Sequence, residues 1–169
     1  YKIKDEDGSI CSRFLEEFKN PLFLNIFCQV VSQDFSFIKR DFSYIELYRK
    51  YIEYRNIVVS DGVDEDPHRN VTGRLLDKLA NSSLFYNSCQ DLPREKARLY
   101  ADQICRNRTW SNSLLYWAIK ENLLLETGAD GESLMFGFQK IGDFLMADAF
   151  CKSKIKNNVK IDFVIDKSE

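Results

Sequence analysis

Residues 123–138 read LLLETGADGESLMFGF, two short apolar runs on either side of a Gly/Asp turn. Leu134, Phe136 and Phe138 recur at every second position of the later run, which is typical of a strand with one buried face. Two such runs around a turn predict a β-hairpin that joins residues 123–127 to residues 133–138.

Amphipathic helical patterns flank this hairpin on both sides. Apolar residues at helical spacing predict three helices before it, over 69–82, 93–106 and 111–122. A fourth pattern predicts a closing helix over 139–152, with Phe144 and Leu145 buried where it packs on the core. Three helices, a hairpin wing and a closing helix form the order of a winged helix.

The first third of the chain is expected to be helical too. Asn20-Pro21 interrupts one helical pattern over 9–19 and starts another over 21–33, because proline is favoured at the first position of a helix. A polar connection over 32–41 separates it from a third pattern over 43–58. The fold class is therefore mainly α, a helical bundle followed by a winged helix.

The acidic run Asp64-Glu65-Asp66 before Pro67 marks the best internal boundary. It divides the chain into a helical domain over 1–62 and a winged-helix domain over 63–153. Residues 154–169 are expected to be a linker or the start of a further element.

Composition narrows the class of protein. The chain has 169 residues, 44% of them hydrophobic, and a net charge of -2, which gives no bulk attraction to nucleic acid or to an anionic membrane. The cysteines are odd in number, widely spaced and without a CxxC motif, which favours reduced thiols in a cytoplasmic protein over disulfides or zinc. The first residue is Tyr1 and not Met, which indicates a piece of a longer protein.

The sequence carries none of the common catalytic motifs. There is no GxxxxGK[ST] loop, GxGxxG, GxSxG or HExxH, and the single histidine, His68, lies in the acidic loop. We expect no catalytic residue, no metal site, no cofactor and no ATP hydrolysis in this region on its own.

Two segments carry a resemblance to a known family. Phe14-Leu15 followed by residues 20–24, NPLFL, resembles the stretch that opens the helical domain after the nucleotide-binding domain in STAND-class P-loop NTPases. Residues 136–147, FGFQKIGDFLMA, resemble the end of the winged-helix domain in the same class. That class comprises signalling ATPases, among them NACHT proteins and bacterial antiviral defence relatives. The two segments lie near opposite ends of the sequence, so the resemblance covers most of the chain.

The resemblance implies a regulatory role. Such a region packs on the nucleotide-binding domain of the same chain and controls activation and homo-oligomerisation, while the parent protein binds ATP or ADP and hydrolyses ATP. It places Asn20 and Pro21 near the adenine and gives Lys140 a charge to offer to the phosphates. A plain helix-start turn and a surface lysine are the alternatives for these residues. Many NACHT proteins carry a histidine where this chain has Phe138, so phosphate sensing by an imidazole is not expected.

Two other functions stay open at this point. A winged helix often binds nucleic acid through its third helix, here 111–122, with Arg106, Arg108 and Lys120 at or near it. The acidic residues of the hairpin and the negative net charge argue against that reading. A protein-interaction domain is the other alternative.

Overall fold

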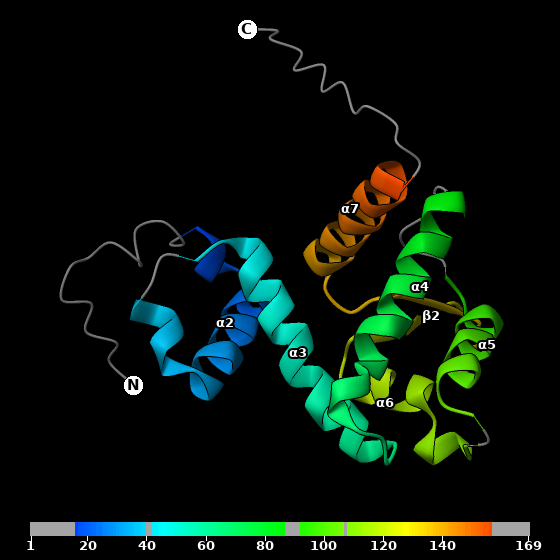
Figure 1. The fold of residues 1–169 in the computed structure, drawn as a ribbon. Helices are drawn as coiled ribbons and strands as arrows, with labels where there is room; N and C mark the ends of the chain where they lie inside the picture. Colours follow the sequence, from blue (N-terminus) through cyan, green and yellow to red (C-terminus); the bar gives the residue numbers. More distant parts are fainter. Residues whose placement is uncertain (1–15, 40–41, 87–91, 107, 157–169) are drawn as a thin grey trace, which may run out of the picture.

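The computed structural model describes residues 16–39, 42–86, 92–106 and 108–156, and this part of the chain is mainly helical with one small sheet (Figure 1). Its helices are η1 (Glu17–Lys19), α2 (Pro21–Gln33), η2 (Phe35–Lys39), α3 (Tyr44–Gly62), η3 (Pro67–Arg69), α4 (Val71–Tyr86), α5 (Arg94–Ile104), η4 (Trp110–Asn112), α6 (Leu114–Lys120) and α7 (Gln139–Lys156). The predicted helix over 9–19 and the tail from 154 lie largely outside the described residues.

Local capping explains where the main helices begin. The Asn20 side chain accepts a hydrogen bond from the Leu22 amide at 2.9 Å, and Pro21 takes the first helical position of α2 as predicted. A reciprocal capping box between Ser43 and Glu46 starts α3. The helix predicted over 111–122 corresponds to α6, which begins three residues later, because Trp110–Asn112 forms a 3-10 turn and Ser113 caps α6.

The sheet is antiparallel and has the order β1-β3-β2. The predicted hairpin is confirmed as β2 (Leu124–Thr127) and β3 (Ser133–Phe136), with Leu124 opposite Phe136. Gly128 and Gly131 adopt positive φ angles of 85° and 65° in its turn, which favours glycine at both positions. A further strand, β1 (Leu92–Pro93), precedes α5 and pairs with the other edge of β3; the sequence did not predict it.

One hydrophobic core contains buried residues from η2, from the helices α2 to α7 and from all three strands. In Figure 1, α3 runs from the neighbourhood of α2 to the group formed by α4, α5 and α6, and α7 lies beside α4. The buried Asn56 side chain donates to the Pro67 carbonyl at 2.8 Å and accepts from the Thr72 amide at 3.1 Å. These bonds fix the bend between α3 and α4, so residues on both sides of position 62 share one packed interior.

Two expectations about burial need correction. Phe144 is only half-buried, whereas its neighbour Leu145 is buried as predicted. The expected polar connection over 32–41 contains η2, whose Phe37 side chain is fully buried against the Phe42 ring. Among the described cysteines, Cys105 is buried, and Cys28 and Cys151 are exposed thiols.

Candidate functional site

The turn between η1 and α2 presents Pro21 at the surface. Asn20 is held by its own capping bonds to the amides of Leu22 and Phe23, at 2.9 and 3.4 Å, so its side-chain oxygen is already occupied. Phe18 packs its ring against Phe23 beneath the turn. Pro21 itself is exposed, which leaves its rigid ring as an apolar surface open to a partner.

Lys140 lies near this turn although it is distant in the sequence. Its ammonium group forms an ion pair with the Glu17 carboxylate, three residues before Asn20. The structure therefore brings the predicted residues Asn20, Pro21 and Lys140 to one side of the molecule. It also gives Lys140 a carboxylate partner, which partly neutralises its charge.

A cavity of about 280 Å³ opens between α2, α3, the hairpin and the start of α7. Its apolar wall includes Ile26, Leu123, Phe138 and Ile141, and polar groups reach it from Asn25, Arg55 and Asn122. Asn20, Pro21 and Lys140 are not among its lining residues, but Leu22 and Ile141, which directly follow two of them, are. The predicted residues thus flank this cavity without forming its wall.

The strand–helix junction at the edge of the cavity is tightly packed. The Gly137 amide donates to the Leu123 carbonyl at 2.9 Å, and a Cβ atom on Gly137 would lie 1.8 Å from the Asn122 carbonyl oxygen. Only glycine fits such a backbone contact. The following Phe138 ring packs edge-on against Tyr48 at 5.9 Å between ring centroids. This junction is therefore an apolar contact to α3.

Burial raises the pKa of the Tyr48 phenol to about 12, and the nearby charges of Glu17, Tyr44 and Asp143 add to the effect. The phenol accordingly stays neutral at physiological pH. The Tyr48 ring contacts Phe138 directly, and it also contacts Tyr44 of α3, whose ring in turn packs against Phe23 of α2.

Arg55 is a residue of this site that the sequence did not single out. Its guanidinium donates to the Glu121 carboxylate at 2.6 Å and to the Gln29 side-chain oxygen at 2.5 Å, and it lies over the Tyr51 ring. These contacts join α2, α3 and the end of α6 at one wall of the cavity. The helical patterns carry no signal for them, because the partners are 26 and 66 residues away in the sequence.

Among the residues that the structure describes, no group of three or more His, Cys, Asp or Glu side chains is placed to hold a metal ion. Within the same residues, no helix has the length and apolar character needed to cross a membrane.

No protein-family model matches the chain, and searches of curated proteins and of solved structures found no significant match.

Proposed function

We propose that this chain is the regulatory helical and winged-helix region of a STAND-type signalling ATPase, which packs on a nucleotide-binding domain and controls its nucleotide-dependent activation and oligomerisation. The observation that carries the proposal is that Lys140 pairs with Glu17 beside the Asn20-Pro21 turn, while the next residues along the chain, Leu22 and Ile141, line one cavity. The resemblance implies that residues 20–24 and 136–147 face the same nucleotide although they are more than a hundred residues apart, and the Lys140–Glu17 ion pair supports this because it holds them on the same side of the fold.

The order of elements supports the winged-helix part of this proposal. The described chain runs α4, β1, α5, α6, β2, β3, with a sheet of order β1-β3-β2. A short strand before the second helix that pairs with the last strand of the hairpin is the sheet arrangement a winged helix needs. The closing helix α7 then packs along α4.

The size and the exposed apolar rim of the cavity support a contact between this side of the molecule and another domain. Its volume of about 280 Å³ is at the lower limit for small-molecule pockets, so it cannot enclose a whole nucleotide. Leu22 and Leu125 line it and remain 42% and 37% exposed. Exposed apolar side chains beside a hollow are typical of a protein contact. In this proposal the nucleotide belongs mainly to the preceding domain, and Pro21 covers one side of the base.

The residues differ in how well they suit the roles that the resemblance gives them. The Asn20 oxygen caps α2 and Lys140 is paired with Glu17, so each already has a structural partner. Pro21 is exposed, and its structural role is to occupy the first position of α2. Pro21 is therefore the residue on which the proposal is best tested.

The packing of α6 weighs against the nucleic-acid alternative. Glu121 at its end is bound to Arg55 of α3, and a Cβ atom on Gly62 of α3 would lie 2.2 Å from the Trp117 ring. The helix that would enter a major groove is thus partly covered by α3. The hairpin adds the exposed acidic residues Glu126, Asp130 and Glu132, which repel phosphates.

The test is Pro21→Ala in the full-length parent protein, with ADP affinity measured by calorimetry. We expect the affinity to fall several-fold, because an apolar contact to the base is lost. In the 169-residue chain the same change should alter the unfolding free energy by under about 1 kcal/mol. Pro67→Ala is the matched control, since Pro67 is also exposed and also begins a capped helical turn.

Unchanged ADP affinity in a folded Pro21→Ala parent would remove the proposed role of the Asn-Pro turn. A parent that binds no adenine nucleotide at all would overturn the wider assignment.

A further inference from the structure

A chain of hydrogen bonds fixes the direction in which the Asn25 amide faces at the cavity between α2, α3 and the hairpin. A guanidinium can only donate, so the Gln29 side chain turns its oxygen to Arg55, at 2.5 Å. The Gln29 amide nitrogen is then left to donate to the Asn25 side-chain oxygen, at 3.1 Å. The NH₂ group of Asn25 therefore points away from this chain of bonds as a free donor, and Asn25 is exposed and lines the cavity.

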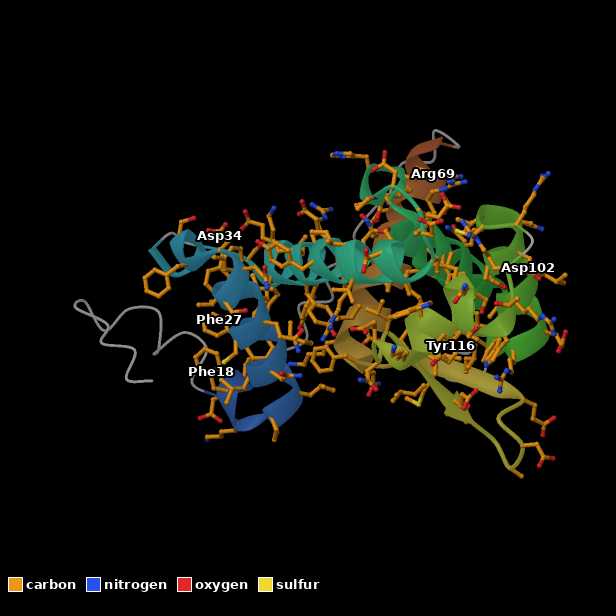
Figure 2. The ribbon with its side chains drawn as sticks, turned by 90° about the horizontal axis from the view of Figure 1, so that it is seen from below. Phe18, Phe27, Asp34, Arg69, Asp102 and Tyr116 are labelled. Carbon is orange, nitrogen blue, oxygen red and sulfur yellow. The ribbon has the colours of Figure 1, made fainter. Side chains whose placement is uncertain are left out.

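A second amide lines the cavity from the side of α6. Asn122 follows this helix, is exposed, and its side chain forms no hydrogen bond with any residue that the structure describes. In Figure 2, Phe27 of α2 and Tyr116 of α6 lie in different parts of the molecule, with α3 running between those parts. The lining residues come from both parts, so Asn25 and Asn122 offer amide groups to the cavity from two sides.

The cavity presents no unpaired charge. Among the residues that line it in the described ranges, Arg55 alone is charged, and its ion pair with Glu121, at 2.6 Å, neutralises it. Helix α2, which forms one wall, has no charged residue among its 13, although 30% of the whole chain is charged. An ionised group that entered the cavity would lose water without gaining an opposite charge, so the part of a ligand that enters is neutral.

The interior of the cavity is apolar and small. The side chains of Ile26, Leu123 and Ile141 are buried around it, and the exposed Leu22 and Leu125 extend the apolar surface to the rim. Its volume of about 280 Å³ lies just below the roughly 300–1,000 Å³ of pockets that enclose a small molecule. A single apolar side chain of a partner suits this volume, as an anchor in a pocket does at protein interfaces.

We propose that the cavity binds an extended, uncharged peptide segment of the domain that covers it. One apolar side chain of the segment enters the cavity, and a main-chain carbonyl oxygen beside it accepts a hydrogen bond from the Asn25 NH₂ group. The Asn122 amide, which can both donate and accept, pairs with a neighbouring peptide group. That the segment belongs to a neighbouring domain rests on the proposed function; its chemistry follows from the groups that line the cavity.

A peptide segment fits these groups better than a nucleotide or a lipid does. A nucleoside phosphate that placed its base in the cavity would bring its charged groups to the apolar rim at Leu22 and Leu125. A hydrocarbon chain would fill the interior but would leave the Asn25 donor without an acceptor. A peptide supplies the apolar side chain and the carbonyl oxygen within one residue.

The experiment selects ligands from a random dodecapeptide library displayed on phage, with the 169-residue chain as the target. Selected peptides are synthesised with a fluorescent label, and anisotropy measures their affinity for the wild type, Leu22→Asp and Asn25→Asp. We expect the selected peptides to share an uncharged stretch that contains Leu, Met or Phe. Both variants should bind them about tenfold more weakly or worse.

Each variant has a matched control. Asn25→Asp keeps the oxygen that accepts from Gln29 and replaces only the outward donor, with an oxygen that repels a carbonyl. Asn112→Asp, at an exposed residue of η4, makes the same change away from the cavity. Leu24 lies on α2, is 40% exposed and does not line the cavity, so Leu24→Asp is the control for Leu22→Asp. Both controls should bind as the wild type does, and thermal melting shows that each variant is folded.

A library that yields no uncharged apolar peptide, or peptides that bind folded Asn25→Asp as tightly as the wild type, would overturn the proposal. So would displacement of the peptides by adenosine at lower concentration than by unlabelled peptide, or a dimer of the chain that Leu22→Asp dissociates. The proposed function is tested separately through Pro21 and ADP affinity. Peptide binding that depends on Asn25, together with unchanged ADP affinity in Pro21→Ala, would support the peptide site and remove the role of the Asn-Pro turn.

Discussion

At position 55 a single guanidinium joins three elements of the fold. Arg55 and its partner Glu121 are only 20% and 16% exposed, so the pair is largely removed from water. The Arg55 Nε atom is buried without a hydrogen-bond partner in the described structure, which leaves the site incompletely satisfied. Such a pair stabilises the fold mainly because removing one member leaves the other buried and uncompensated.

We expect Glu121→Gln to lower the free energy of unfolding by about 1–3 kcal/mol, because the Arg55 charge then loses its carboxylate. Arg55→Met should cost a similar amount. The double variant should cost less than the sum of the two, since neither charge is then left alone. Urea unfolding of the four proteins measures this coupling. Additive losses would show that the ion pair does not act as a unit.

The residues that could be predicted are those whose role is local. Asn20 and Pro21 start a helix through contacts within three residues, and a short pattern contains that information. Arg55 and Glu121 meet across 66 residues, and no periodicity in either helix records the meeting. The same holds for Lys140, whose charge was foreseen but whose partner Glu17 was not.

At the scale of elements, α7 shows which structural features the apolar periodicity of a sequence predicts and which it does not. The pattern predicted a helix over 139–152, and the structure has Gln139–Lys156. Ile141, Leu145 and Ala149, at four-residue spacing, are buried. Phe144 was expected to be buried as well, but it lies at the edge of that face, with the Tyr48 ring on one side and the Arg49 guanidinium 5.8 Å from its centre. The strand β1 has only two residues, too few for any period, and only its partner β3 defines it.

The difference in burial between Leu145 and Phe144 predicts that their replacement by alanine lowers the free energy of unfolding by different amounts. Leu145→Ala should lower the free energy of unfolding by about 2–5 kcal/mol, as for other fully buried leucines. Phe144→Ala should cost less, about 1–2 kcal/mol, because part of its ring already faces water. Thermal or urea unfolding of both variants tests the order, with the exposed Ala147→Gly on the same helix as a control for helix propensity. A larger loss for Phe144→Ala than for Leu145→Ala would contradict the position of α7.

At the scale of the whole molecule, the mainly α class followed from the sequence because each long helix carries its own amphipathic pattern. The packing of α2 and α3 on the later elements could not be predicted from the sequence, because it depends on contacts between residues that are distant along the chain. Tyr48 is one such contact: its ring meets Tyr44 on the side of α2, and Phe138 and Phe144 on the side of α7. The alkaline stability of the molecule should therefore depend on this phenol.

Burial, reinforced by Glu17, Tyr44 and Asp143, raises the pKa of Tyr48 from 10.0 to about 12 in the folded chain. The neutral phenol therefore contributes stability that is complete below pH 10 and is lost as the pH rises through 12. A difference of this size corresponds to at most about 2–3 kcal/mol. In Tyr48→Phe no phenol remains to ionise, so the free energy of unfolding should fall less steeply between pH 9 and pH 12. Tyr54→Phe, on the same helix, should keep the wild-type slope because Tyr48 is still present. Urea unfolding at a series of pH values measures how steeply the free energy of unfolding falls with pH in each protein. Equal slopes for Tyr48→Phe and the wild type would show that the loss of stability at alkaline pH comes from groups other than Tyr48.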